Sequence, residues 1–369
     1  MLEPLNAAFN RLNAAFNRQD YETVAQLLEP LQKQHPDHPW VKFYTGRYRE
    51  VLGEVEAAEA IYRELLREVT NPKVVAQARQ GLQRLEAYAQ QQKEDAIAQS
   101  AAEPHHLGVG FLILEPIQGE ARQAAAQNLA RITKLDAYSA RLQIPSRGWR
   151  LYRTGIMGEI AFYGNEFRKA GIPAFWMPLS AVQSLRVFRV SYLQAVSPQA
   201  IVVCQDESDR TGSMSFEWSE VKQRVEGLLP IFESVVDVDA RRNLKRKEQT
   251  LDYAQVVDLH LPKRNCILRF CDRSYQFQQG VVFDASQDGQ PLNRVSTRIR
   301  WNTLVHFLGE QLAEIPLHND FTVFAETALD HLDFIYDLKP HIDLLRREPT
   351  NWDPAFHLYS GLTFRKNFR

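Results

Sequence analysis

The sequence contains little cysteine and no long apolar run. Three cysteines in 369 residues are few, and odd in number, for a disulfide framework, which predicts a reducing compartment. No apolar run approaches the roughly 20 residues that a membrane-spanning helix needs. The first residues also lack the cationic and apolar regions of a secretory signal. These absences predict a soluble, cytoplasmic protein that does not bind a membrane.

The chain also lacks a net charge of either sign. Its 44 lysines and arginines nearly balance 45 aspartates and glutamates, so we expect no direct binding to nucleic acid through a chain-wide basic surface. Local charge is uneven: the net charge is +6 in residues 141–200, +5 in 241–273 and −7 in 301–345. Most cations of the two basic segments are arginine, whose planar donor group suits phosphate and guanine. The pattern fits recognition of a compact anion, and it equally fits pairing of basic and acidic segments within a subunit or across a dimer.

Catalytic and cofactor motifs are missing as well. The glycines form neither a G-x-G-x-x-G turn between a strand and a helix nor a phosphate-binding G-x-x-x-x-G-K-[ST] loop. The histidines have no H-E-x-x-H spacing. Cys266 and Cys271, five apart in an expected strand, would face opposite sides and share no metal. The sequence therefore predicts a non-enzymatic protein without a cofactor or a metal.

Residues 1–98 carry the spacing of helical repeats. Small residues and one aromatic residue recur at intervals of 7, 5 and 4: Gly46, Gly53, Ala58 and Tyr62. This spacing is typical of a tetratricopeptide repeat of ~34 residues, in which helices cross closely at the small residues. A preceding repeat would turn at Asp20 and end at Pro36, and residues 73–91 would form a capping helix. We expect a tetratricopeptide-like domain that binds a protein partner or serves only for packing or dimerisation, followed by a linker at 99–107.

Residues 108–240 predict an α+β domain. Short apolar or alternating runs indicate strands at 109–114, 149–153, 173–178, 187–190 and 200–204. The spacing of apolar residues indicates helices at 120–134, 158–170 and 219–232. Two β-α-β passes of this size favour a ferredoxin-like layer of helices on an antiparallel sheet.

Residues 241–369 predict a β-rich α+β domain. Strands are expected at 253–259 and 266–277, and helices at 302–312 and 320–338. Because side chains alternate along a strand, Arg269 and Arg273 would project from the same face. The aromatic tail from Trp352 to Tyr359 is expected in the core. The whole chain is thus assigned to the α+β class, with helical repeats at its N-terminus.

A basic run precedes the first of these strands. Arg242 and Arg246 stand one helical turn apart, so both can reach one ligand, and guanine needs bidentate donors at O6 and N7. The pair resembles the R-x-x-x-R motif of PilZ-type receptors for cyclic-di-GMP, and Asp272-x-Ser274 resembles the start of their second motif. Phe277 stands where that motif ends in glycine, so no PilZ barrel is expected. The alternative is a solvated linker or a generic basic patch.

The chain as a whole also resembles a known group of proteins. The segments 135–142, 145–155 and 265–277, combined with the repeats, are similar to a cyanobacterial family of tetratricopeptide-containing cyclic-di-GMP receptors that act in cell-size control. The resemblance implies a non-enzymatic homodimer that binds the dinucleotide at its subunit interface. It also implies that ligand state is passed to a protein partner, a transcription regulator of the Crp type.

Arginines from the two basic segments are the main candidate ligand residues. They would hold the phosphates and guanine edges of cyclic-di-GMP, with an aromatic or guanidinium face stacked on the bases. The candidates are Arg147, Trp149, Arg150, Arg153, Arg241, Arg242, Arg246, Arg269, Asp272 and Arg273. Two alternatives remain open. One is a scaffold whose repeats bind a protein partner without a small ligand, for instance in photosynthetic complex assembly, and the other is an unusual hydrolase.

Overall fold

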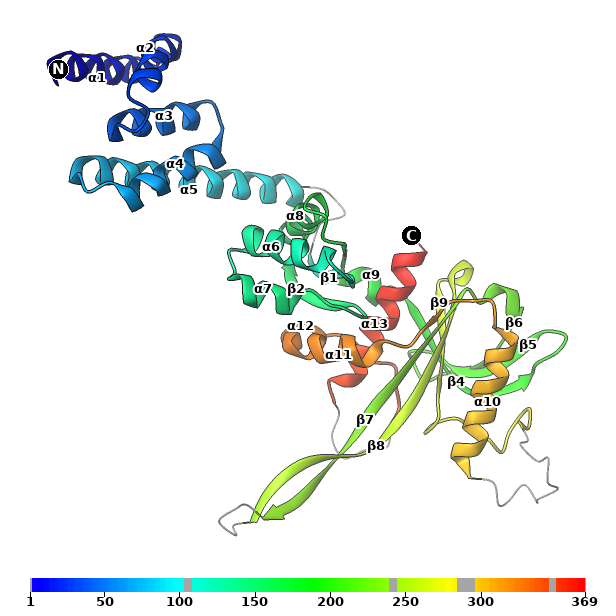
Figure 1. Ribbon diagram of the computed structural model, residues 1–369. Helices are drawn as coiled ribbons and strands as arrows, with labels where there is room; N and C mark the ends of the chain where they lie inside the picture. The colour runs from blue at the N-terminus through cyan, green and yellow to red at the C-terminus, as the bar shows by residue number, and fades with distance from the viewer. Residues whose placement is uncertain (1, 103–107, 239–243, 284–295, 345–349, 369) are drawn as a thin grey trace. The chain divides into compact units, whose positions relative to one another are not determined.

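The computed structural model describes residues 2–102, 108–238, 244–283, 296–344 and 350–368 (Figure 1). The chain divides into two compact units, Met1–Ala98 and Gln99–Arg369. Helices form the first unit, and both β-sheets lie in the second. The α+β class expected from the sequence is confirmed. Among the described helices, none has both the length and the apolar character of a membrane span.

Consecutive helices build the first unit. They are α1 (Leu2–Asn17), α2 (Tyr21–Gln34), α3 (Pro39–Val51), α4 (Val55–Glu68) and α5 (Pro72–Ala101). Asp20 caps α2 by accepting a hydrogen bond from the Thr23 N–H at 3.1 Å. Pro39 lies in the first turn of α3, where its missing N–H costs no hydrogen bond. Because α5 continues to Ala101, the expected linker does not begin at residue 99.

Tyr62 of α4 is the centre of the core of this unit. Its ring is fully buried against Gly46 of α3 and Gly81 of α5, where a methyl group would come within 2.9 and 2.5 Å of ring carbons. Its hydroxyl donates to Glu50 Oε2 at 2.7 Å, and Arg84 donates to both oxygens of the same carboxylate. Burial, together with the hydrogen bond to Glu50, raises the pKa of Tyr62. The helices therefore approach most closely where the small residues lie.

Gly81→Ala is expected to lower the free energy of unfolding, although alanine favours a helix by about 1 kcal/mol over glycine. The added methyl group would overlap the Tyr62 ring, and such overpacking costs about 1–3 kcal/mol. Chemical denaturation followed by circular dichroism measures the change. Gln80→Ala, at an exposed neighbouring position of α5, is the control. Equal stability of the two variants would contradict this close contact.

The second unit begins with a three-stranded antiparallel sheet in the order β2-β1-β3. Its strands are β1 (Val109–Leu114), β2 (Arg150–Ile156) and β3 (Ala174–Pro178). The helices that pack on one face are α6 (Ala121–Thr133), α7 (Ala137–Gln143) and α8 (Met157–Lys169). The expected ferredoxin-like layer would need a fourth strand, but the strands expected at 187–190 and 200–204 belong to another sheet.

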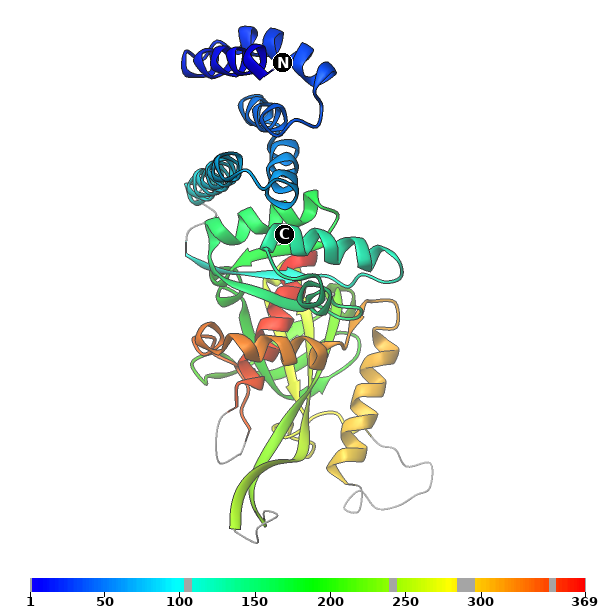
Figure 2. The same ribbon diagram turned by 60° about the vertical axis from the view of Figure 1, so that its left-hand side comes forward.

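A seven-stranded sheet follows, in the order β10-β7-β8-β9-β4-β5-β6. Its strands are β4 (Arg186–Ala195), β5 (Ala200–Gln205), β6 (Thr211–Phe216), β7 (Gln223–Val238), β8 (Leu244–Leu261), β9 (Cys266–Cys271) and β10 (Leu317–His318). α10 (Thr297–Gln311) packs on one face through Trp301, Leu304 and Leu308. α13 (Trp352–Asn367) packs on the opposite face (Figure 2).

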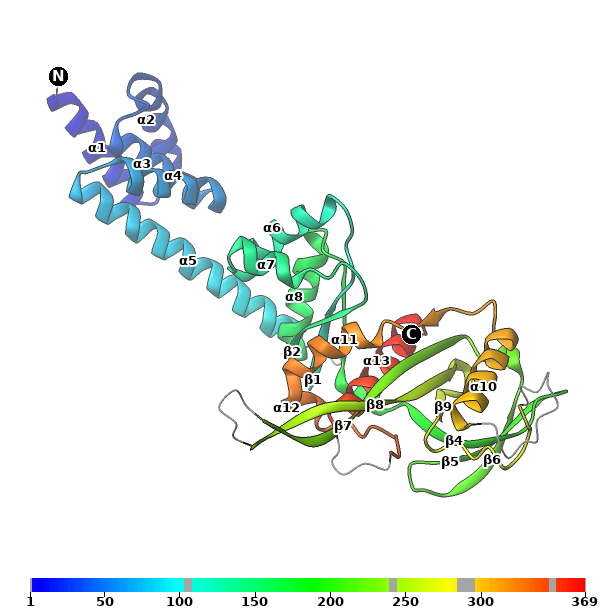
Figure 3. The same cartoon turned by 60° about the horizontal axis from the view of Figure 1, so that its bottom comes forward.

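The helix expected at 219–232 is wrong, because this segment is a 3₁₀ turn, Trp218–Glu220, followed by β7. Val221, Val225 and Leu229 are buried four residues apart, and a spacing of four fits one face of a strand as well as one face of a helix. Gln223, buried between them, shows the two-residue period of a strand. β7 and β8 form a long hairpin (Figure 3). The expected domain boundary at 240/241 lies outside the described residues, and the division into compact units does not separate 108–240 from 241–369.

The expected helix at 320–338 is broken into shorter pieces. These are α11 (Phe321–Ala328), the 3₁₀ turn Leu329–His331 and α12 (Leu332–Ile335). The aromatic tail forms α13, which is buried along its whole middle, from Asp353 to Phe364, as expected. Its side chains contact both sheets and α11. α13 therefore holds the second unit together, and α9 (Leu179–Gln183) packs beside it.

Candidate functional site

Arg269, a candidate ligand residue, lies inside the protein with 2% of its surface exposed. Its guanidinium donates to both carboxylate oxygens of Asp258, at 2.8 and 2.6 Å, and to the Pro340 carbonyl at 2.5 Å. It also lies over the Phe356 ring of α13, with 5.0 Å between the guanidinium carbon and the ring centre. The prediction that Arg269 holds a ligand is therefore wrong, because it already contacts a carboxylate, a carbonyl and an aromatic ring.

Asp272 and Arg273 follow β9 in a turn, because the strand ends at Cys271 and not at Phe277. Arg269 and Arg273 consequently do not share a strand face. Arg273 forms an ion pair with Asp252. Asp272 Oδ1 accepts a hydrogen bond from the Gln255 N–H at 3.0 Å, and burial raises the pKa of its carboxyl group. Both side chains thus have partners within the same subunit.

The other candidates of the second basic segment cannot be placed at a site. Arg241 and Arg242 lie outside the described residues. Arg246 lies in β8 and pairs through its backbone with Val236 of β7, but its side chain is outside the described part of the chain. The R-x-x-x-R interpretation of this run therefore stays a prediction.

The candidates of the first basic segment lie around β2 and have different surroundings. Trp149 packs on Phe175 and Tyr359, with ring centres 4.9 and 5.8 Å apart, and is a core residue. Arg153 forms an ion pair with Glu159 at 2.7 Å. Arg150 is half-buried, and burial lowers the pKa of its guanidinium.

Arg147 is the remaining candidate of that segment. It is exposed in the loop between α7 and β2, and it makes no ion pair within the described part of the chain. The first basic segment therefore contains cations that form no ion pair with a described carboxylate. In the second segment, the candidate arginines whose side chains are described, Arg269 and Arg273, both pair with a carboxylate.

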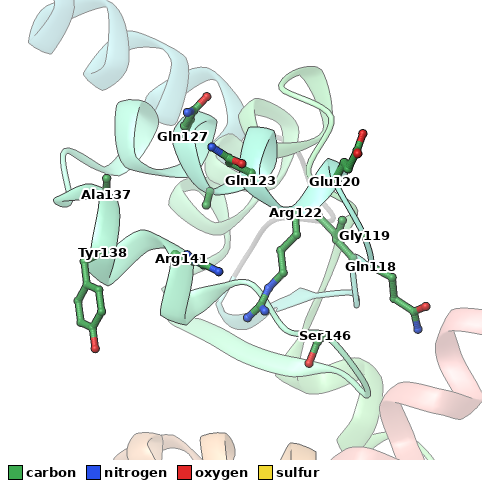
Figure 4. Close-up of a pocket in the computed structure, with 12 residues that line it drawn as sticks. Gln118, Gly119, Glu120, Arg122, Gln123, Gln127, Ala137, Tyr138, Arg141 and Ser146 are labelled. Carbon is green, nitrogen blue, oxygen red and sulfur yellow. The ribbon is translucent and has the colours of Figure 1, made fainter.

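A pocket of about 770 Å³ opens beside this loop, between α6 and α7 (Figure 4). Its volume lies within the range of pockets that bind small molecules. The residues that line it are Ile117, Gln118, Gly119, Glu120, Arg122, Gln123, Ala126, Gln127, Ala137, Tyr138, Arg141 and Ser146. The lining thus combines two guanidinium groups, three amides, two hydroxyls and one carboxylate.

Arg122 and Arg141 give the pocket its charge. Both side chains extend into the space between α6 and α7 in Figure 4. Arg122 donates through Nη2 to the Ile144 carbonyl at 3.0 Å, while its buried Nε has no hydrogen-bond partner. Neither arginine forms an ion pair with a described residue. Because Arg122 is anchored at one nitrogen only, its remaining donors can bind an anion.

Local sequence explains why these groups meet. Gly119 adopts φ +65°, which turns the chain into α6 one residue before Glu120, so Arg122 lies in the first turn of that helix. Asp136 caps α7, with Oδ1 accepting from the Tyr138 and Ser139 N–H groups at 3.0 and 2.9 Å. A hydrogen bond with the Ser139 side chain, together with the backbone hydrogen bonds, lowers the pKa of Asp136. The turn at Gly119 and the cap at Asp136 thus fix where α6 and α7 begin on the two sides of the pocket.

No protein-family model, curated protein or solved structure matches this chain. Its own geometry is therefore the basis for any functional conclusion. Arg141 belongs to the first basic segment but is not among the residues predicted from the sequence, and neither are Arg122 and Tyr138. A glycine before a helix start is the signal that could have pointed to Arg122; the sequence holds no comparable signal for Tyr138.

A hydrogen-bonded serine and histidine, which could suggest catalysis, lie in the core instead. His260 Nε2 is 2.9 Å from Ser360 Oγ, and both residues are fully buried. Ser360 donates its single proton to Asp258 Oδ2 at 2.6 Å, so His260 must donate to Ser360 rather than accept from it. His260 Nδ1 in turn accepts from Gln223 Nε2 at 2.7 Å. A histidine in this tautomer cannot activate the serine.

The cysteines and acidic groups offer no better case for catalysis. Burial raises the pKa of the Cys204, Cys266 and Cys271 thiols to about 11, so they stay protonated at neutral pH. Within the described ranges, no three His, Cys, Asp or Glu side chains gather as metal ligands would. The pocket between α6 and α7 is thus the strongest candidate site, and its chemistry is that of anion binding.

Proposed function

We propose that the protein is a non-enzymatic receptor for cyclic-di-GMP that binds the dinucleotide in the pocket between α6 and α7. The observation that carries the proposal is a pocket of about 770 Å³ with two arginines that form no ion pair with a described carboxylate. Arginine binds phosphate in a bidentate manner, and such charge-assisted hydrogen bonds are the strong ones. The first basic segment is favoured over the second because Arg141 belongs to it, while the other pocket arginine, Arg122, lies before both segments.

The lining offers a partner for each part of the ligand. Arg122 and Arg141 would bind the phosphates, and the side-chain amides of Gln118, Gln123 and Gln127 can donate to and accept from guanine edges. Tyr138, 73% exposed, provides an aromatic ring on which a base can stack. The pocket is open on one side, which suits a ligand shared with a second subunit.

The first unit would transmit the ligand state. Its helices fit tetratricopeptide-like repeats, because Gly46 and Gly81 pack against Tyr62 at the helix crossings. Such repeats bind proteins and carry no chemistry of their own. In this proposal they contact a transcription regulator of the Crp type, and cell-size control is the process that the resemblance implies. The homodimer that the resemblance implies is part of the same proposal.

Calorimetric titration tests the proposal. Cyclic-di-GMP is expected to bind with micromolar affinity, whereas GTP and cyclic-di-AMP give no comparable heat. Arg141→Ala is expected to weaken binding more than about tenfold, or about 1.4 kcal/mol, without loss of stability because Arg141 is exposed. Arg79→Ala, an exposed arginine of α5, is the control. If none of the three nucleotides gives a heat of binding, the receptor proposal is contradicted. Turnover of added nucleotide would indicate a hydrolase.

A scaffold without a small ligand is the second candidate. It is favoured by the pairing of three predicted ligand arginines with carboxylates of the same subunit, namely Arg153, Arg269 and Arg273 with Glu159, Asp258 and Asp252. In that case the basic and acidic segments serve packing alone, and the helical unit is the functional part. A partner bound equally well with and without cyclic-di-GMP would support it.

A further inference from the structure

We propose that two copies of this chain associate through two neighbouring surfaces of opposite charge, one formed around α7 and the other around α12. The proposal is argued from the exposure and charge of described residues. It deepens the proposed function and rests on it for the homodimer, and Tyr138 belongs both to this surface and to the lining of the nucleotide pocket. The oligomeric state of the chain without nucleotide tests it separately from nucleotide binding.

The first surface, which we name the basic face, comprises Lys134, Leu135, Tyr138, Leu142 and Arg147. Its apolar members are Leu135, which is 39% exposed and lies just before α7, and Tyr138 and Leu142, which are 73% and 58% exposed and stand four residues apart on one side of α7. Lys134 and Arg147 are exposed and make no ion pair within the described ranges. Residues 131–150 contain five arginines and lysines but one carboxylate. Cations thus surround a strip of exposed apolar side chains.

The second surface, which we name the acidic face, comprises Asp330, Leu332, Asp333, Tyr336 and Asp337. Leu332 is 42% exposed and Tyr336 81% exposed. The three aspartates are exposed; Asp333 and Asp337 form no ion pair with a described residue, whereas the charge of Asp330 also acts on Arg150 of the same chain. Residues 320–338 contain five carboxylates and neither lysine nor arginine. The acidic face is therefore the chemical counterpart of the basic face, with apolar side chains among charges of the other sign.

The two faces are neighbours on the second unit. The loop that follows α7 packs against α11, since Gly148 at φ +62° faces Asp320 and Val323. Further along β2, the Leu151 N–H donates to Thr327 Oγ1 at 3.1 Å. Figures 1 and 3 both show α7 and α12 flanking β2. No ion pair joins the described residues of the two faces within one chain.

A second copy is the partner that fits both faces at once. A two-fold axis between neighbouring faces brings the basic face of each copy onto the acidic face of the other, so every contact occurs twice. A different partner would need both a basic and an acidic surface in the matching arrangement. The association would bury exposed tyrosine, which is enriched at protein interfaces, and salt would weaken it because its charges lie at the surface.

Charge reversal tests this arrangement with the full chain. Wild-type protein is expected to be dimeric by light scattering after size exclusion, and increasingly monomeric at high salt. Asp333→Lys with Asp337→Lys, and separately Lys134→Glu with Arg147→Glu, are each expected to raise the dissociation constant more than about tenfold. All four residues are exposed, so thermal unfolding should show that both variants remain folded.

Mixing the two variants gives the decisive result. In a two-fold arrangement the mixed pair has both contacts matched, one through the native charges and one through the reversed charges, so dimers are expected to return. Glu54→Lys, an exposed change in the first unit, is the control and should stay dimeric. A monomeric wild type, dimeric single variants, or a mixture that stays monomeric would each overturn the proposal.

Discussion

Arg269→Met is expected to destabilise the protein by about 3–5 kcal/mol, because it leaves the fully buried Asp258 carboxylate without its cation. Asp258 would keep only the hydrogen bond from Ser360. Chemical denaturation measures the loss. Arg273→Met, which removes a half-exposed pair with Asp252, is the matched control and is expected to cost about 1 kcal/mol or less.

The paired change Asp258→Leu with Arg269→Met is expected to recover much of that stability, because removing both members of a buried pair leaves no uncompensated charge. These variants also distinguish a structural role of Arg269 from a ligand-binding role. If Arg269 held a ligand instead, Arg269→Met would fold with nearly wild-type stability and lose binding. That outcome would contradict the structural role assigned to Arg269.

The Asp258–Arg269 pair matters because it ends a continuous line of hydrogen bonds. Asn367 donates to Gln223, Gln223 to His260, His260 to Ser360 and Ser360 to Asp258. The line joins α13 to β7 and β8 through the core. A buried network in which every member has a partner specifies a single packing arrangement. It therefore fixes α13 against the seven-stranded sheet.

Acid is expected to unfold the second unit well before most carboxylates are neutralised. Burial lowers the pKa of His341 to about 4 and holds the pKa of His260 and His357 well below the usual 6.5. The positive charge of Arg269 lowers all three as well. Since the unfolded chain binds these protons near pH 6.5 and the folded chain does not, stability is complete above pH 6.5 and falls as pH decreases.

The free energy of unfolding is expected to change steeply with pH. Each histidine with a lowered pKa contributes up to about 1.4 kcal/mol per pH unit below pH 6.5, so the three together add at most about 4 kcal/mol per pH unit. Urea denaturation at several pH values measures it. His341→Gln should make the slope shallower by about one third, whereas the exposed His306→Gln should leave it unchanged. Stability that is constant from pH 7 to 4.5 would contradict the burial of these histidines.

Much of the fold could be predicted where local patterns and burial agree. The strand at 109–114 and the helix at 158–170 were identified almost to the residue, because a fully apolar run and a glycine after the last turn leave little choice. β7 was misassigned because Val221, Val225 and Leu229 fit two periodicities at once. Only pairing with β8, along the whole of β7, decides between them.

The candidate site shows a different limit of sequence analysis. Composition identified arginine-rich segments, but a sequence does not show which arginines already have partners. Arg269 and Asp258 are eleven residues apart and meet only because β8 and β9 are antiparallel neighbours. Arg122 and Arg141 come together only after α6 and α7 have packed across the pocket. Partners of this kind are set by tertiary structure.

Hydrogen–deuterium exchange of the full chain, with and without cyclic-di-GMP, tests the central claim most directly. The dinucleotide is expected to slow exchange in peptides that cover residues 117–146, which line the pocket and form α6 and α7. Peptides that cover β8 and β9 should exchange at the same rate in both samples. Exchange that stays unchanged at saturating dinucleotide would contradict the claim. So would exchange that slows at residues 262–273 but not at 117–146.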